Sequence, residues 1–155
     1  DSATGYGKLD LGAALAKPPP ARDPLEPNED FRFIDGRAYG HRARAIWTGR
    51  SPARLTALLD LFEDPSDVYR IRVPPHRTVR IRVRPRFGNT DLDVYAGGAP
   101  TVASDRGLIA RSRHKGRRPD GARLRNRGTK TRTAYIQVYV RGRHPLDSRY
   151  TLSVR

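Results

Sequence analysis

Apolar and polar residues alternate through much of the chain with the two-residue period of β-strands. Between residues 78 and 87, Val79, Ile81 and Val83 alternate with arginines, which places the aliphatic side chains on one face of a strand. The same pattern predicts further strands at 68–73, 90–97, 133–140 and 148–155. We expect an all-β fold, an antiparallel β-sandwich or jelly roll with a short N-terminal helix. The predicted core contains Val79, Ile81, Val83, Ile136, Val138, Val140, Leu152 and Val154.

Three segments depart from this regular alternation. The uneven period within 68–73 indicates a bulge or register change near Tyr69. Residues 53–62, ARLTALLDLF, have the propensity of a helix, although their β context argues against one. Residues 103–128 contain many Arg and Gly residues and little periodicity, which predicts a long surface loop.

The N-terminal region has a different pattern. Residues 5–16, GYGKLDLGAALA, predict a loop that enters a short helix with an apolar surface on nearly all sides, and such a helix requires burial against another surface. The segment KPPPARDP ends it, because three successive prolines favour an extended linker. These features predict an N-terminal tail at 1–16, a proline-rich linker at 17–23 and a β domain at 24–155.

The composition limits the possible chemistry. The 155 residues carry a formal net charge of +15, with 27 Arg and four Lys, and include neither Cys nor Met. The lack of cysteine excludes disulfides and thiolate zinc sites and leaves hard cations as candidate metals. The lack of methionine indicates a fragment of a longer protein. No apolar run approaches the roughly 18 residues of a membrane span, and the arginine excess fits either a polyanionic partner or coding composition.

Carboxylates are concentrated at two points, PLEPNED at 24–30 and FEDPSD at 62–67. Calcium takes about six to eight oxygen ligands from carboxylates, amides and backbone carbonyls. These two segments offer such oxygens close together if they meet at one end of a sandwich. Turn chemistry accounts for Asn, Asp and Pro equally well, so both interpretations remain open from the residues alone. The candidate ligands are Glu26, Asn28, Glu29, Asp64 and Asp67.

The strands also carry candidate surface-binding residues. Arginines that alternate along neighbouring strands would line a solvent face, which is typical of polyanion binding or of a solvated sheet surface. Two tyrosines share one face of a late strand and are further candidates. The set is Arg70, Arg72, Arg80, Arg82, Arg84, Tyr135 and Tyr139.

No catalytic constellation is evident. The histidines lie in Arg- or Pro-rich turn sequences, and we expect them at the surface. Asp91 and Asp93 are a close pair, which we interpret as strand-end or turn residues. Without a Ser–His–carboxylate arrangement, we expect no enzymatic activity from this chain. The four histidines are His41, His76, His114 and His144.

Five short segments in order resemble the bacterial pre-peptidase C-terminal domain, a family that includes the collagen-binding domains of clostridial collagenases. They are EPNE at 26–29, DPSDVY at 64–69, DLDVY at 91–95, AYIQVYV at 134–140 and YTLSV at 150–154. The resemblance implies a β-sandwich attached to a secreted protease. It also implies that the five candidate ligands named above bind Ca²⁺, and that tyrosines of the late strands contact a surface or substrate.

The N-terminal segment TGYGKLDLGAAL is similar to the end of the catalytic domain of subtilisin-like (S8) serine proteases. This similarity implies that residues 1–16 are the tail of such a domain in an exported serine endopeptidase. The partners would then be the upstream catalytic domain and a protein substrate or anionic surface. The family's catalytic residues have no matching positions here. The alternative is a basic β-sandwich module that binds polysaccharide or nucleic acid outside any protease.

Overall fold

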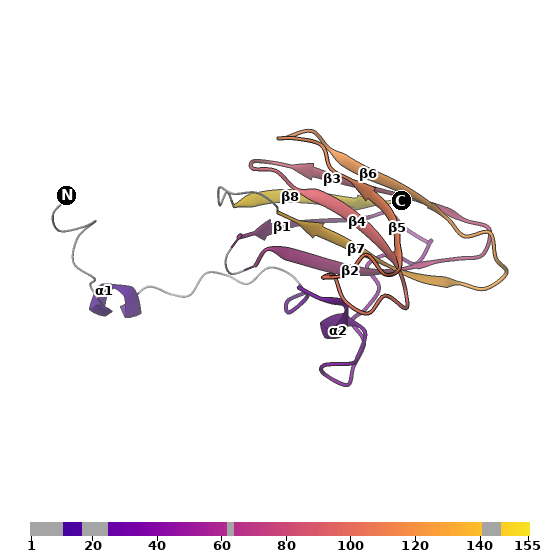
Figure 1. Cartoon of the computed structure of the whole chain (residues 1–155), viewed down its shortest axis with the longest axis horizontal. Coiled ribbons are helices and arrows are strands. Elements are labelled where there is room, and N and C mark those ends of the chain that lie inside the picture. Colours follow the sequence, from indigo (N-terminus) through magenta and orange to yellow (C-terminus); the bar gives the residue numbers. More distant parts are fainter. Residues whose placement is uncertain (1–10, 17–24, 62–63, 141–146) are drawn as a thin grey trace.

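Two four-stranded antiparallel sheets form the body of the molecule (Figure 1). The structure, a computed structural model, describes residues 11–16, 25–61, 64–140 and 147–155. One sheet has the strand order β1-β8-β3-β6 and the other the order β2-β7-β4-β5. The strands are β1 (Ala53–Leu59), β2 (Ser66–Val73), β3 (Thr78–Pro85), β4 (Asp91–Ala96), β5 (Leu108–Ser112), β6 (Asp120–Arg125), β7 (Arg132–Tyr139) and β8 (Ser148–Val154).

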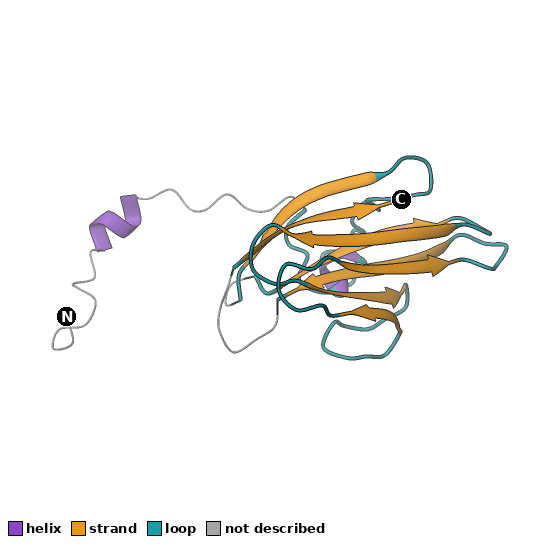
Figure 2. Cartoon of the chain, turned by 90° about the horizontal axis from the view of Figure 1, so that it is seen from above, coloured by secondary structure: helices purple, strands orange, loops and turns teal. Residues whose placement is uncertain are grey.

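The chain crosses between the sheets at almost every connection. Only β4 and β5 are consecutive strands that pair within one sheet, and the connecting loops gather at the ends of the sandwich (Figure 2). This strand order is the connectivity of an eight-stranded jelly roll. The predicted all-β sandwich is therefore confirmed.

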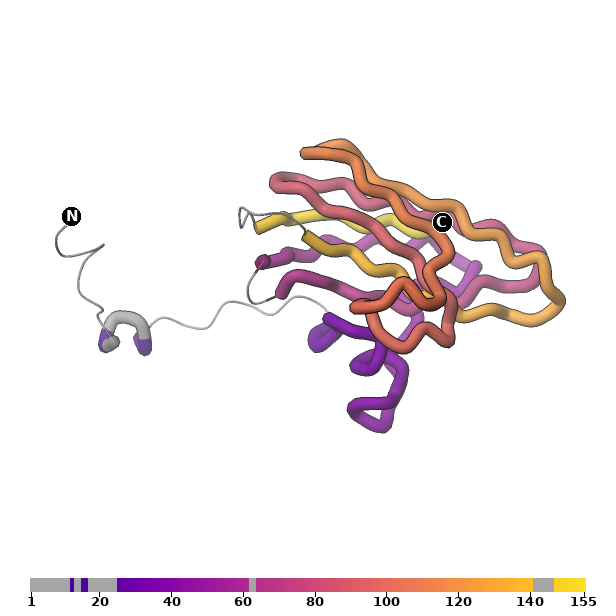
Figure 3. Tube along the Cα trace, viewed as in Figure 1, coloured from indigo at the N-terminus to yellow at the C-terminus, as the bar shows by residue number. Residues whose placement is uncertain are grey.

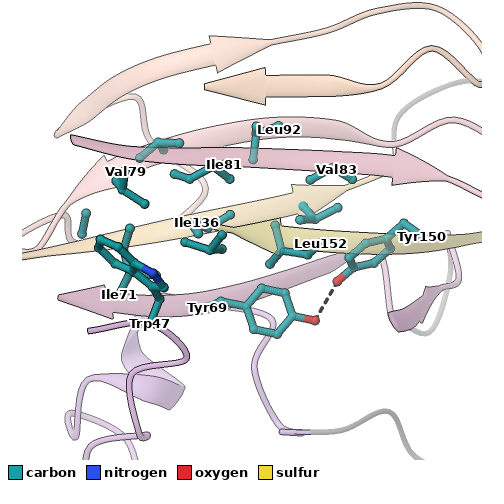
Figure 4. Packing of buried hydrophobic residues seen from close by; sticks show 14 of the residues in the cluster. Trp47, Tyr69, Ile71, Val79, Ile81, Val83, Leu92, Ile136, Tyr150 and Leu152 are labelled. Carbon is teal, nitrogen blue, oxygen red and sulfur yellow. Dashed lines mark hydrogen bonds between the residues drawn. The ribbon is translucent and has the colours of Figure 1, made fainter. Parts of the chain in front are cut away.

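The core lies between the sheets and is built from the alternating inward positions of both. β3 shows the pattern most clearly, because its residues alternate between exposed and buried over its whole length. Figure 4 shows aliphatic side chains of the two sheets packed against one another, with Trp47 at one end of the cluster. All eight residues predicted for the core are buried there.

A second apolar cluster covers the outer face of the β2-β7-β4-β5 sheet. Helix α2 (Phe31–Ile34) lies beside β2 (Figure 3). It places the ring of Phe31 against Tyr135, with centroids 4.9 Å apart and stacked, and against Tyr95, with centroids 4.9 Å apart and edge-on. Val68 belongs to the same cluster. Both faces of β2 are therefore buried near Val68, which explains the uneven apolar period there.

The structure resolves one open segment and corrects two local predictions. Residues 53–59 form a strand, β1, which pairs with β8 along its whole length. The expected loop at 103–128 contains β5 and β6. β2 pairs with β7 without a register shift near Tyr69, whereas an irregularity occurs between Val94 and Tyr95.

The predicted short helix is present as α1 (Leu11–Ala16). Its Leu15 side chain is 85% exposed, so no part of the chain that the structure describes covers it. The proline-rich linker predicted at 17–23 lies outside the described residues. Among the residues that the structure describes, no helix is long and apolar enough to cross a membrane.

Candidate metal centre

Three of the five predicted ligands converge at the start of β2. Carboxylate oxygens of Glu26, Asp64 and Asp67 all lie within 4.8 Å of one another. Asp67 is the second residue of β2 and is fully buried. Asp64 is fixed by a pair of backbone hydrogen bonds with Asp60, 2.9 and 3.1 Å long. Oxygens this close repel when ionised, unless a cation lies among them.

Asn28 lies beside this cluster, whereas Glu29 is not among the carboxylates that converge there. The backbone N–H of Val68 donates to the Asn28 carbonyl at 2.8 Å, and the Asn28 N–H donates to Glu26 Oε2 at 3.1 Å. These bonds hold the 26–29 segment beside Asp67. The Asn28 side chain is fully buried, and neither its Oδ1 nor Glu29 Oε2 has a hydrogen-bond partner among the described residues. A buried amide oxygen in this position is costly unless something binds it.

Asp30, the last acid of the first segment, has a separate structural role. Its Oδ1 accepts from the Arg32 N–H at 3.1 Å as the N-cap of α2. Its Oδ2 accepts from the Thr101 hydroxyl at 2.5 Å and from the Val102 N–H at 3.3 Å. The acidic cluster therefore divides into one capping residue and a group of candidate ligands.

Two buried tyrosines orient Asp67. The Tyr150 hydroxyl donates to Asp67 Oδ2 at 2.5 Å, and the Tyr69 hydroxyl lies 2.7 Å from that of Tyr150 (Figure 4). Since the Tyr150 proton points to Asp67, Tyr69 donates to Tyr150. Burial, followed by the charge of Asp67, raises the pKa of Tyr150 well above its ordinary value. The hydroxyl therefore keeps the proton that it donates.

At a metal centre built on Asp67, Tyr150→Phe should weaken cation binding by about tenfold or more, because supporting hydrogen bonds of this kind orient metal ligands. It should also destabilise the fold by about 1–2 kcal/mol through the lost buried hydrogen bonds. Tyr69→Phe is the matched control, since it removes the outer donor and leaves the bond to Asp67. Titration calorimetry measures whether calcium affinity falls more in Tyr150→Phe than in Tyr69→Phe. Equal calcium affinity in both variants and the wild type would show that the tyrosines do not position Asp67.

The predicted surface tyrosines differ in position. Tyr135 is only 3% exposed, under Phe31, which rules out a surface role. Tyr139 is half-buried, and its hydroxyl accepts from Arg113 Nε at 2.8 Å. The sequence placed both tyrosines on one face correctly, but it did not show that α2 covers part of that face.

The predicted arginines do not form one stripe. β2 carries Arg70 and Arg72, whereas β3 carries Arg80, Arg82 and Arg84, and these strands belong to different sheets. Arg70 is half-buried and Arg72 is exposed on the outer face of the β2-β7-β4-β5 sheet. The three arginines of β3 are exposed on the outer face of the other sheet. The arginines of β2 and those of β3 are close in the sequence but lie on opposite sides of the molecule.

Asp91 and Asp93 are buried strand residues: Asp91 is the strand-end residue that was one of the two expectations, whereas Asp93 lies inside the strand and neither is in a turn. Both lie in β4, with side chains 7% and 2% exposed. Arg111 on β5 binds Asp93 through Nε at 3.0 Å and Nη2 at 2.8 Å, and reaches Asp105 through Nη2 at 2.6 Å. Hydrogen bonds to Asp93 and Asp105 raise the pKa of Arg111 and keep it charged. Because β5 lies inside the segment that was expected to be a loop, no strand register could be predicted that would pair these residues.

Ser112, His114 and Asp120 come together without the geometry of a catalytic triad. Ser112 Oγ donates to Asp120 Oδ1 at 2.5 Å, and His114 Nδ1 lies 3.0 Å from the same oxygen. A triad requires the serine and the carboxylate on opposite ring nitrogens, whereas here both face Nδ1. His41, His76 and His114 are exposed, and His144 lies outside the described residues.

Comparison with solved structures identifies the class of fold. It is the fold of pre-peptidase C-terminal domains. The chain is similar to the pre-peptidase C-terminal domain of a collagenase from Bacillus anthracis, with a TM-score of 0.53 and 18% identity over 74% of this chain and 100% of that one.

A second solved structure is less similar. It is PliG from Aeromonas hydrophila, a periplasmic inhibitor of g-type lysozyme, with a TM-score of 0.44 and 18% identity over 71% of this chain and 96% of that one. No protein-family model matches the sequence, and no curated protein matches it.

Proposed function

We propose that this chain is a non-catalytic accessory domain of a secreted subtilisin-like serine protease, and that it binds one Ca²⁺ at the junction of its N-terminal segment and β2. The similarity to a collagenase's pre-peptidase C-terminal domain supports the accessory role and a location outside the cell. The S8-like segment at the N-terminus supports the subtilisin-like parent. The domain would stabilise the protease and help it to engage its substrate or a surface.

The buried oxygen cluster is the observation that carries the calcium proposal. Glu26, Asp64 and Asp67 contribute carboxylates within 4.8 Å of one another. Asn28 adds a fully buried amide oxygen for which no described residue provides a hydrogen bond. A set of hard oxygen donors of both charged and neutral kinds suits Ca²⁺, which accepts irregular geometry, better than Mg²⁺, which requires a strict octahedron.

Calcium binding to the metal-free chain tests this proposal directly. Titration calorimetry should give one site per chain. Glu26→Gln should reduce its affinity by about tenfold, because Glu26 belongs to the carboxylate cluster and calcium affinity depends on the number of charged ligands. Asp105→Asn is the matched control, since it removes an exposed carboxylate from another loop. The absence of calcium-dependent heat in the wild type, with the fold intact by circular dichroism, would refute the site.

A further inference from the structure

The outer face of the β1-β8-β3-β6 sheet forms a shallow, strongly basic groove. It has a volume of about 910 Å³, and its lining includes eight arginines and one acid, Asp120. The arginines come from β1, β3 and β6 and from the segments that flank the strands, including Arg155 directly after β8. We use the term arginine groove for the surface formed by Arg54, Arg80, Arg82, Arg84, Arg123 and Arg155.

Strand register brings these like charges side by side. Arg80 on β3 is directly opposite Arg123 on β6. On its other side it exchanges two backbone hydrogen bonds with Arg155, 2.7 and 3.0 Å long. Arg82 is opposite Ser153, which is opposite Arg54 in turn. Like charges directly opposite one another destabilise a sheet, so this arrangement costs stability unless anions lie over it.

No carboxylate neutralises the arginine groove within the described part of the chain. The six guanidinium groups form no ion pair there, whereas on the opposite sheet Arg111 pairs with Asp93 and Asp105. The acid at the edge of the groove, Asp120, is 1% exposed and accepts from Ser112 and from the His114 N–H. The same molecule therefore neutralises one set of arginines and leaves the other open to a ligand.

We infer that the arginine groove binds an acidic polysaccharide through the oxyanions of its sulfate or carboxylate groups. Guanidinium groups bind such oxyanions in a planar, bidentate manner. Alternate residues of β3 repeat at roughly 6.6–6.8 Å, so Arg80, Arg82 and Arg84 present a row of cations. The half-buried Ser153 hydroxyl between the rows is suited to bind a sugar hydroxyl, whereas the buried Thr151 hydroxyl pairs with that of Thr56 at 3.3 Å.

The same surface is less suited to nucleic acid. Single strands bind through aromatic side chains on which bases stack, and the residues lining the groove include no aromatic one. Reading a duplex requires a helix or ribbon that enters the major groove, whereas here the cations lie across the face of a sheet. Charge attraction alone would then produce non-specific duplex binding.

Binding is measured with fluorescently labelled heparin, which is sulfated, polygalacturonate, which carries carboxylates only, and a duplex DNA of matched charge, all at 150 mM salt. The groove variant is Arg82→Thr with Arg84→Thr. The matched control is Arg72→Thr with Arg106→Thr, which removes the same charge from exposed positions elsewhere. Threonine preserves strand propensity, and melting curves confirm that both variants fold.

We expect a polysaccharide to bind more tightly than the duplex. The groove variant should lose on the order of tenfold in affinity, and the control should stay within about twofold of the wild type. Binding of either polysaccharide supports the inference. The polysaccharide that binds more tightly shows whether the groove prefers sulfate or carboxylate. Equal losses in the two variants, tighter binding of the duplex or no polysaccharide binding would each overturn it.

Discussion

Millimolar Ca²⁺ is expected to raise the melting temperature of this chain by about 10 °C over the value in excess chelator. A ligand that binds only the folded state adds about 2.7 kcal/mol of stability at a hundredfold excess over Kd. For a domain of this size, each kcal/mol shifts the melting temperature by several degrees. Without the ion, the carboxylates of Glu26, Asp64 and Asp67, with oxygens within 4.8 Å of one another, repel. Magnesium should have a smaller effect because it requires a tighter octahedron.

Asp67→Asn removes the negative charge of this ligand and keeps its side-chain shape. The amide keeps an oxygen that can accept from Tyr150, so the buried contact survives. We expect its melting temperature to be the same with calcium and with chelator. Asp105→Asn, which changes the net charge equally at an exposed position, should retain the full calcium response. A wild-type chain, stripped of metal, that melts identically in chelator and in calcium would contradict the proposed centre.

Replacing Arg111 by Met should destabilise the fold by about 3 kcal/mol. The Asp93 carboxylate is 2% exposed and accepts from Arg111 through both of its oxygens. Removal of one partner of a buried ion pair leaves a charge without compensation and costs roughly 3–5 kcal/mol. Arg113, with Nη2 4.0 Å from Asp93 Oδ2, compensates in part. Methionine retains the apolar stem of the arginine, so lost packing contributes little.

The double variant Arg111→Met, Asp93→Asn tests this explanation. Because it removes both charges, it should recover most of the lost free energy of unfolding, measured in guanidinium chloride. Arg106→Met, at an exposed position in the loop before β5 and outside this network, should be nearly neutral. A double variant that is less stable than Arg111→Met alone would show that the stability lost depends on packing instead of charge.

Alternation along the strands was enough to predict the sandwich and its core. Val79, Ile81 and Val83 alternate with arginines because one face of β3 is buried and the other is exposed to solvent. The pattern did not predict which strands are neighbours. β2 and β3 are joined by a short turn yet belong to different sheets, and nothing in their residues distinguishes this crossing from a hairpin.

The candidate site was predictable where oxygen donors were dense in the sequence. Glu26, Asp64 and Asp67 were expected together and lie together. The supporting contacts were not predictable, because Tyr150 reaches Asp67 from the last strand, 83 residues away. Tyr135 shows the opposite error, since its burial depends on Phe31, which belongs to a helix of only four residues.

The central position of the last strand has a consequence for folding kinetics. β8 (Ser148–Val154) lies between β1 and β3 and pairs with both. Until it is in place, these two strands have no common neighbour and the first sheet cannot close. Pairing of residues so distant in the chain is slow, because the entropy of loop closure is lost before the contacts compensate for it. During synthesis, the domain can therefore complete its fold only after the C-terminal strand has emerged, and until then the edges of β1 and β3 are open to other chains.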